Sequence, residues 1–195
     1  MRDLLAGFEP SWFLTGGWAV DAWLGRQTRD HGDVDITVFH HDQHAVFEHF
    51  SEWTLVAHDP GVPDDTNEPW NGRTVDMPAH IHVRGAAVDL EVIFNERSGE
   101  EWVLNREVPL ALPLERSTIL SGWGIPTAPP EVVLFFKAGG DLTAAALDAV
   151  DGSPRPRDEQ DFLALLPVLT NPARAWLRDA LARTRPHHPW LTRLR

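Results

Sequence analysis

The spacing of apolar and polar residues predicts short strands and helices in the first half of the chain and mainly helices in its last third. Alternating or short apolar runs bounded by turn residues predict strands at 11–15, 33–39, 53–57, 79–83 and 87–94, the last two as a hairpin about Arg84 and Gly85. Apolar residues at helical spacing predict helices at 2–9, 16–24, 42–50, 132–138, 157–166 and 172–183. Extended chain is expected over 102–119. The pattern indicates an α/β (α+β) fold, with a mixed lobe over residues 1–125 and a helical C-terminal lobe over residues 126–195.

A pair of glycines and a pair of aspartates stand out near the N-terminus. The glycines belong to Gly16-Gly17-Trp18-Ala19-Val20-Asp21, where a predicted strand passes into a helix. The first N–H groups of a helix have no partner within it, so they attract phosphate. The aspartates end Thr28-Arg29-Asp30-His31-Gly32-Asp33-Val34-Asp35 and share one strand face, because strand side chains alternate. Two close carboxylates favour a hard divalent cation between them, which together with the glycines indicates phosphoryl or nucleotidyl transfer.

This order of parts resembles the nucleotidyltransferase superfamily of DNA polymerase β, and most closely the aminoglycoside and lincosamide nucleotidyltransferases. Those enzymes carry Gly-Gly-Trp-Ala-x-Asp and Thr-Arg-x-His-x-Asp-x-Asp, which match residues 16–21 and 28–35. Residues 130–137 and 155–162 resemble a further pattern, Pro-Glu-x-x-Leu-x-x-Lys followed by Arg/Lys-x-Lys-Asp-x-x-Asp-Phe. The likeness covers most of the chain and is strongest over residues 14–36.

The resemblance implies a nucleotidyltransferase-type mixed sheet and an adenylyltransferase-like reaction. A nucleoside monophosphate would pass from an NTP, expected to be ATP, to a hydroxyl group of a small acceptor. The acceptor expected from the likeness is an aminoglycoside-like antibiotic, which would make the protein an antibiotic-resistance enzyme. The expected cofactor is Mg²⁺ or Mn²⁺.

The resemblance also implies three catalytic and metal-ligating carboxylates, which are Asp33, Asp35 and Asp89. Asp89 lies in Val88-Asp89-Leu90-Glu91 and would contact the metal near the acceptor hydroxyl and take its proton. Glu91 shares a strand face with Asp89. Asp89 is preferred because the related aminoglycoside enzymes carry their third aspartate in a hydrophobic-Asp-x-Glu context. Taken alone, the alternation also fits a half-exposed strand with solvated carboxylates.

The nucleotide-binding residues that the resemblance implies are Gly16, Gly17, Arg29, Lys137 and Arg157. Lys137 is the only lysine beside 16 arginines, which suggests a position that needs a compact ammonium group. Asp158 and Asp161 are spaced to share a helix face and are expected to pair with Lys137 or Arg157. Asp21 is expected either to orient Arg29 or to be an exposed helix residue.

Charge along the chain is uneven and bears on the partners. The net charge is −12, with −16 over residues 1–152 and +4 over residues 153–195. An acidic body argues against broad binding of nucleic acid and suits a cationic acceptor, although it also serves solubility. The chain has no cysteine, no apolar run of membrane-spanning length and no signal-peptide core, so a cytoplasmic location is expected.

Histidines and one tryptophan are further candidates for function. The histidines form two groups, His40, His41 and His44 in one and His80 and His82 in the other. The chain has no cysteine to complete a metal site with either group. Ordinary loop or surface histidines are therefore favoured over a dedicated metal site. His80 or His82 is expected to approach Asp89 across the hairpin. The long polar loop at 59–76 contains Trp70, the tryptophan expected to stack on a ligand.

Two other function classes remain open. The first is a toxin–antitoxin or abortive-infection nucleotidyltransferase that acts on protein or RNA, for which the basic C-terminal segment with Arg174, Arg178, Arg183 and Arg185 would serve. The second is a binding protein without turnover, which the intact carboxylates argue against. The sequence identifies neither the acceptor nor the base of the NTP, because loops determine both.

Overall fold

A mixed β-sheet carries most of the candidate chemistry of this chain. The computed structural model describes residues 3–59, 68–85, 88–142 and 153–195. Its strands are β1 (Trp12–Leu14), β2 (Val34–Phe39), β3 (Thr54–His58), β4 (His80–Arg84), β5 (Leu90–Ser98), β6 (Glu101–Asn105), β7 (Leu110–Pro113), β8 (Ile119–Leu120) and β9 (Pro126–Thr127). The strand order in the sheet is β3-β4-β5-β2-β1-β9-β8, and β6 and β7 extend from the end of β5.

The pairing of β2 with β5 is parallel, whereas β5 pairs antiparallel with β4 and β2 pairs antiparallel with β1. Parallel neighbours need a long crossover connection, and here the chain passes through α2 (Gln43–His49), β3 and β4 before returning as β5. Ile36 and Val38 of β2 and Val92 of β5 are fully buried, so the core fixes this register. The central parallel pair therefore joins residues about 55 apart in sequence.

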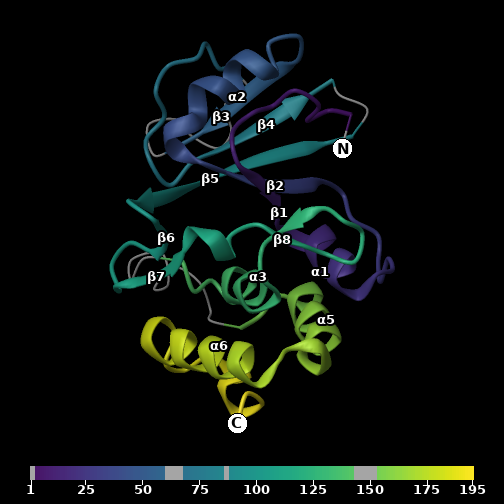
Figure 1. Cartoon of the computed structure of the whole chain (residues 1–195), viewed down its shortest axis with the longest axis vertical. Helices are drawn as coiled ribbons and strands as arrows, with labels where there is room; N and C mark the ends of the chain where they lie inside the picture. The colour runs from purple at the N-terminus through teal and green to yellow at the C-terminus, as the bar shows by residue number, and fades with distance from the viewer. Residues whose placement is uncertain (1–2, 60–67, 86–87, 143–152) are drawn as a thin grey trace.

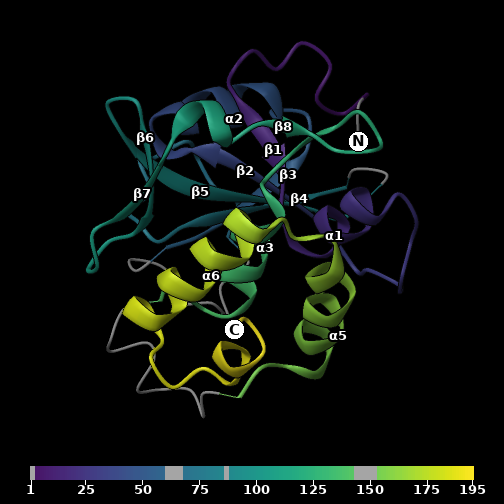
Figure 2. The ribbon, with the colours of Figure 1, turned by 60° about the horizontal axis from the view of Figure 1, so that its bottom comes forward.

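Helices cover one side and one end of the sheet. They are α1 (Gly16–Leu24), α3 (Pro130–Lys137), α5 (Pro156–Leu165) and α6 (Asn171–Thr184), with 3-10 turns at His40–Asp42, Leu114–Arg116, Leu166–Val168 and Pro189–Thr192. In Figure 1, α3, α5 and α6 gather at the end of the molecule opposite α2. Figure 2 shows α3 between α5 and α6, and α3 packs against both as well as against α1.

Most of the predicted elements are confirmed. The predicted hairpin is the antiparallel pair β4–β5, and the five helices predicted from residue 16 onward appear as α1, α2, α3, α5 and α6. The helix expected at 2–9 is wrong, because residues 3–7 form turns. Part of the predicted loop at 59–76 lies outside the described residues, and the division into two lobes at residue 125 stays a prediction.

The fold class is the expected α+β arrangement. Within the described parts of the chain, no helix has both the length and the apolar character that crossing a membrane requires.

Candidate active site

Three carboxylates meet where β2 and β5 run side by side. Asp33 lies just before β2, Asp35 is the second residue of β2, and Glu91 is the second residue of β5. The parallel register pairs Asp35 with Glu91. One carboxylate oxygen from each of the three residues lies within 4.8 Å of the other two. Oxygen donors this close are the ligand set that Mg²⁺ or Mn²⁺ prefers.

Asp89 lies outside this cluster. It precedes β5 by one residue, is exposed, and lines a separate hollow with Asp33, His82 and Arg84. The register of β2 on β5 sets position 91, not position 89, opposite Asp35. Glu91 is therefore the third carboxylate of the cluster, and the role of Asp89 as third metal ligand and base stays a prediction.

The two glycines allow the start of α1 to approach these carboxylates. Gly16 has a φ of +62°, and a Cβ atom at this position would lie 1.7 Å from Oδ2 of Asp35. The backbone N–H of Gly17 donates a hydrogen bond to the Asp35 carboxylate. A Cβ atom at Gly17 would lie 2.3 Å from Nδ1 of His31 and 2.7 Å from Nη2 of Arg29. Glycine at both positions therefore leaves room for Asp35, His31 and Arg29 around the helix start.

His31 is a site residue that sequence reasoning missed. Its Nε2 lies 2.6 Å from Oδ2 of Asp21, a fully buried carboxylate one turn into α1. The other oxygen of Asp21 accepts hydrogen bonds from the N–H and hydroxyl of Thr28. Asp21 therefore orients His31 and Thr28, which corrects the expectation that it orients Arg29. The available signal was the place of His31 within the Thr-Arg-x-His-x-Asp-x-Asp run.

A network of charged side chains, built around the buried Asp158 and Asp161, joins the loop after α1 to α3 and α5. Lys137 Nζ lies 2.7 Å from Oδ2 of Asp161 and 3.3 Å from Oδ1 of Asp158, as expected from the sequence. Arg29 donates two hydrogen bonds to Asp161, at 3.2 and 3.0 Å, and Arg155 donates one to Asp158 at 2.5 Å. Burial opposes ionisation of Asp161, but the hydrogen bonds from Arg29 and Lys137 prevail and lower its pKa. The carboxylates thus hold Lys137 and Arg29 in place.

Carboxylates, glycines and cations line a single cavity of about 330 Å³. Asp33, Asp35 and Glu91 are among its lining residues, together with Gly16, Gly17 and His31. Its other charged lining residues are Arg29, Lys137, Asp141, Arg155 and Arg157. The structure therefore brings every residue of the predicted site except Asp89 to one cavity. A triphosphate with its metal needs this combination of carboxylates and cations.

The electrostatics of the cluster also fit a bound cation. Burial, followed by the charges of Asp35 and Asp33, raises the pKa of Glu91 to about 7. Burial and the charge of Asp33 likewise raise the pKa of Asp35, against the lowering effect of Lys137 and of the Gly17 hydrogen bond. The three carboxylates repel one another, and a divalent cation among them would relieve that repulsion.

Outside the cavity, the structure corrects the expectation for Trp70 and agrees with the expectation for the first group of histidines. Trp70 is buried, packs edge-on against Phe47, and donates a hydrogen bond to the carbonyl of Arg73, so it is a core residue. His40 forms a hydrogen bond with the carbonyl of Val75, whereas His41 lies beside Asp42. The group of His40, His41 and His44 therefore does not converge on one metal position.

The chain is similar to a known family and to solved structures. Residues 1–65 match the family model described as aminoglycoside-2''-adenylyltransferase. The solution structure of the antibiotic-resistance factor ANT(2'')-Ia is similar over 92% of this chain and 85% of its own, with 16% identity and a TM-score of 0.58. The crystal structure of ANT(2'')-Ia with adenylyl-2''-tobramycin covers 93% of this chain and 92% of its own, with 15% identity and a TM-score of 0.57.

The lincomycin-bound lincosamide antibiotic adenylyltransferase LnuA is also similar, over 86% of this chain and 92% of its own, with 20% identity and a TM-score of 0.54. A search of curated protein sequences found no match. The chain thus has the fold of the nucleotidyltransferases. The family match and the solved structures together support a relationship to the aminoglycoside and lincosamide nucleotidyltransferases.

The close approach of Gly16 to Asp35 gives a first prediction. Gly16→Ala should abolish nucleotide binding and lower stability by well over the roughly 1 kcal/mol that a positive φ alone costs. Gly25→Ala is the matched control, because Gly25 also has a positive φ of +70° but nothing within 4 Å of its Cβ position. Urea unfolding and nucleotide titration check both variants. Equal losses of stability and of nucleotide binding in Gly16→Ala and Gly25→Ala would contradict a steric clash with Asp35.

The raised pKa of Glu91 gives a second prediction, for the metal-free protein. A carboxyl group whose folded pKa lies above its unfolded value costs stability as the pH rises from about 4.5 to about 7. Glu91→Gln removes this cost, so the variant should gain on the order of 2 kcal/mol over the wild type between pH 5 and pH 8. Urea unfolding in a chelating buffer measures the gain. Glu48→Gln, on the exposed side of α2, should show none, and a pH-independent difference for Glu91→Gln would refute the assignment.

Proposed function

We propose that this chain is a metal-dependent nucleotidyltransferase that moves a nucleoside monophosphate from an NTP, ATP by family resemblance, to a hydroxyl group of a small cationic acceptor. The observation that carries the proposal is the single cavity in which Asp33, Asp35 and Glu91 face the start of α1 and the cations around Lys137. The adenylyltransferase relatives support the reaction class.

The proposed reaction needs no covalent enzyme intermediate. The acceptor oxygen forms a bond to the α-phosphorus, the bond from that phosphorus to the pyrophosphate oxygen breaks, and the hydroxyl proton passes to a carboxylate. Asp33 and Asp35, with Glu91, would hold Mg²⁺ or Mn²⁺, whose charge offsets that of the phosphates. The start of α1 supplies backbone N–H donors, and Arg29, Lys137 and Arg157 supply positive charge for the phosphate oxygens.

A second cavity adjoins the first and is our candidate site for the acceptor. It has a volume of about 400 Å³ and includes the acidic residues Asp59, Glu96 and Asp141. Ile93, Asn95, Phe136 and Asp141 line both cavities. Because Glu91 precedes Ile93 on the same face of β5, it is the carboxylate on the acceptor side and our candidate for the proton acceptor. Asp59 pairs with Arg73 and Glu96 with Arg106, so an aminoglycoside-like cation would have to displace these arginines from the carboxylates.

The alternative reaction on protein or RNA has less support. Three of the four C-terminal arginines donate to backbone carbonyls within the chain: Arg174 to Leu166, Arg183 to Pro109 and Arg185 to Ala138. These guanidinium groups tie α6 to its neighbours and are not free to form a phosphate-binding surface. The geometry therefore favours a small acceptor.

A third prediction separates the two cations on α3 and α5. Lys137→Ala should weaken NTP binding and also lower stability by about 3 kcal/mol, because it leaves Asp158 and Asp161 buried with fewer partners. Arg157→Ala should weaken NTP binding alone, since Arg157 is exposed at the cavity. Calorimetric titration and thermal unfolding check both. Unchanged NTP affinity in both variants would remove this side of the cavity from the proposed site.

A fourth prediction tests the third carboxylate. Glu91→Gln should slow single-turnover transfer by roughly 10²- to 10⁴-fold, because the amide cannot accept a proton or match a carboxylate at a metal. Asp89→Asn should change the rate by less than about tenfold, since it lies outside the cluster.

The assay for this prediction uses Mg²⁺, labelled NTPs and a panel of aminoglycosides and lincosamides, with tRNA and proteins as competing acceptors. A collapse in Asp89→Asn with a near-normal Glu91→Gln would reverse the assignment. Labelling of tRNA or protein alone would replace the small acceptor by the alternative reaction.

A further inference from the structure

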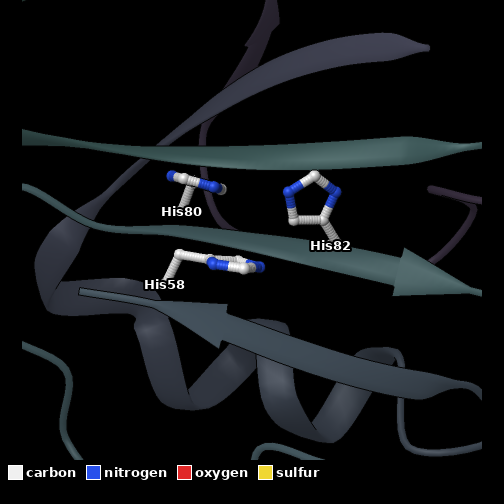
Figure 3. Close-up of side chains that lie close together, drawn as sticks. All are labelled: His58, His80 and His82. Atoms are coloured by element: carbon white, nitrogen blue, oxygen red, sulfur yellow. The ribbon is translucent and has the colours of Figure 1, made fainter. Parts of the chain in front are cut away.

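Three histidines lie together on the face of the sheet beside the carboxylates. His58 of β3 pairs in register with His80 of β4, and His82 follows on the same face of β4. The ring centroids are 4.8 Å apart for His58 and His80, 4.9 Å for His58 and His82, and 5.1 Å for His80 and His82. Figure 3 shows the three side chains close together, with His80 and His82 beside each other and His58 next to them. Strand pairing thus brings together residues from two separate segments.

The three rings offer a set of nitrogen ligands. One ring nitrogen from each histidine lies within 4.8 Å of the other two. A tetrahedral ion with metal–nitrogen bonds of about 2.0–2.1 Å holds pairs of nitrogens about 3.4 Å apart, so small side-chain rotations would suffice. The backbones are fixed by the β3–β4 ladder, and His58 is only 8% exposed. A site of this kind is built on rigid strands and not on loops.

A fourth ligand stands next to the rings. Nε2 of His80 lies 3.7 Å from Oε1 of Glu91. The β4–β5 register sets His82 directly opposite Glu91. Glu91 therefore adjoins two clusters, the histidines on one side and Asp33 with Asp35 on the other.

The chemistry of the two clusters differs. Imidazole nitrogens suit Zn²⁺, Cu²⁺, Ni²⁺ and Co²⁺, whereas carboxylate oxygens suit Mg²⁺ and Mn²⁺. Three histidines and one carboxylate form a complete tetrahedral set for a borderline ion.

We propose that His58, His80 and His82 bind one transition-metal ion of the Zn²⁺ class, with Glu91 as its fourth ligand, at a site that adjoins the hard-ion site and shares Glu91 with it. Occupancy of this site draws Glu91 away from Asp33 and Asp35. As far as the proposed transfer reaction is concerned, the bound ion is an inhibitor, and this part of the inference rests on the proposed function. Binding itself does not depend on that reaction.

The test uses Co²⁺ as a spectroscopic probe on the full chain carrying Asp33→Asn and Asp35→Asn, which weakens the hard-ion site. One equivalent of Co²⁺ should produce the intense visible absorption of a tetrahedral ion. Zn²⁺ should displace it, and a large excess of Mg²⁺ should not. Adding His80→Asn or His82→Asn should weaken binding by roughly 100-fold or more. His44→Asn, an exposed histidine on α2, is the matched control and should leave the signal unchanged.

Each outcome decides the proposal. Loss of the absorption in His80→Asn and His82→Asn, with retention in His44→Asn, supports the site. Absence of the absorption in the parent, or its persistence in both folded variants, overturns it. If Glu91→Gln leaves the Co²⁺ spectrum and the Co²⁺ affinity of the parent unchanged, Glu91 is not the fourth ligand.

Thermal unfolding with Zn²⁺ gives a second readout that needs no activity. If either variant fails to fold, the other variant and the parent still decide the result. Failure of the nucleotidyltransferase proposal would leave the Co²⁺ spectrum in place, so the two failures are distinguishable.

Discussion

The repulsion among three carboxylates is the constraint around which this structure is organised. The parallel register of β2 on β5 sets Asp35 against Glu91, and Asp33 joins them on the same face. In the metal-free protein this concentration of charge raises the pKa of Glu91 to about 7 and also raises that of Asp35. A fold that only had to be stable would gain from neutral side chains at these positions. Three close carboxylates at these positions are what the proposed cation site requires.

The surroundings of the cluster are fitted to that charge. Gly16 is required because any side chain there would overlap Asp35, and the N–H of Gly17 hydrogen-bonds the same carboxylate. Across the cavity, Asp158 and Asp161 hold Lys137 and Arg29, so positive charge is fixed within reach of a phosphate. A triphosphate with its metal would complement both sides of the cavity, the metal facing the carboxylates and the phosphates facing the cations. This complementarity underlies the proposed nucleotidyl transfer.

Local features were predictable from the sequence and long-range register was not. The glycine turn, the helix α1 and the spacing of Asp33 and Asp35 follow from adjacent residues and short-range rules. The pairing of Lys137 with Asp158 and Asp161 followed from a resemblance and helical spacing. Which of Asp89 and Glu91 joins the cluster depended on how β5 registers with a strand 56 residues earlier, which hydrophobic alternation alone does not fix. For the same reason the meeting of His58 with His80 and His82 was not visible, because only the β3–β4 pairing creates it. The orientation of His31 by Asp21 likewise required the folded loop.

The most direct test of the account is a crystal structure of the protein with Mn²⁺ and a non-hydrolysable ATP analogue, with Mn²⁺ located by its anomalous scattering. The account predicts an anomalous peak within coordination distance of Asp33 and Asp35 and the triphosphate, with Glu91 facing the same ions. It also predicts the triphosphate against the start of α1 and Lys137. A peak held by Asp89 and not by this cluster, or a triphosphate bound outside the cavity of Asp33, Asp35 and Glu91, would contradict it.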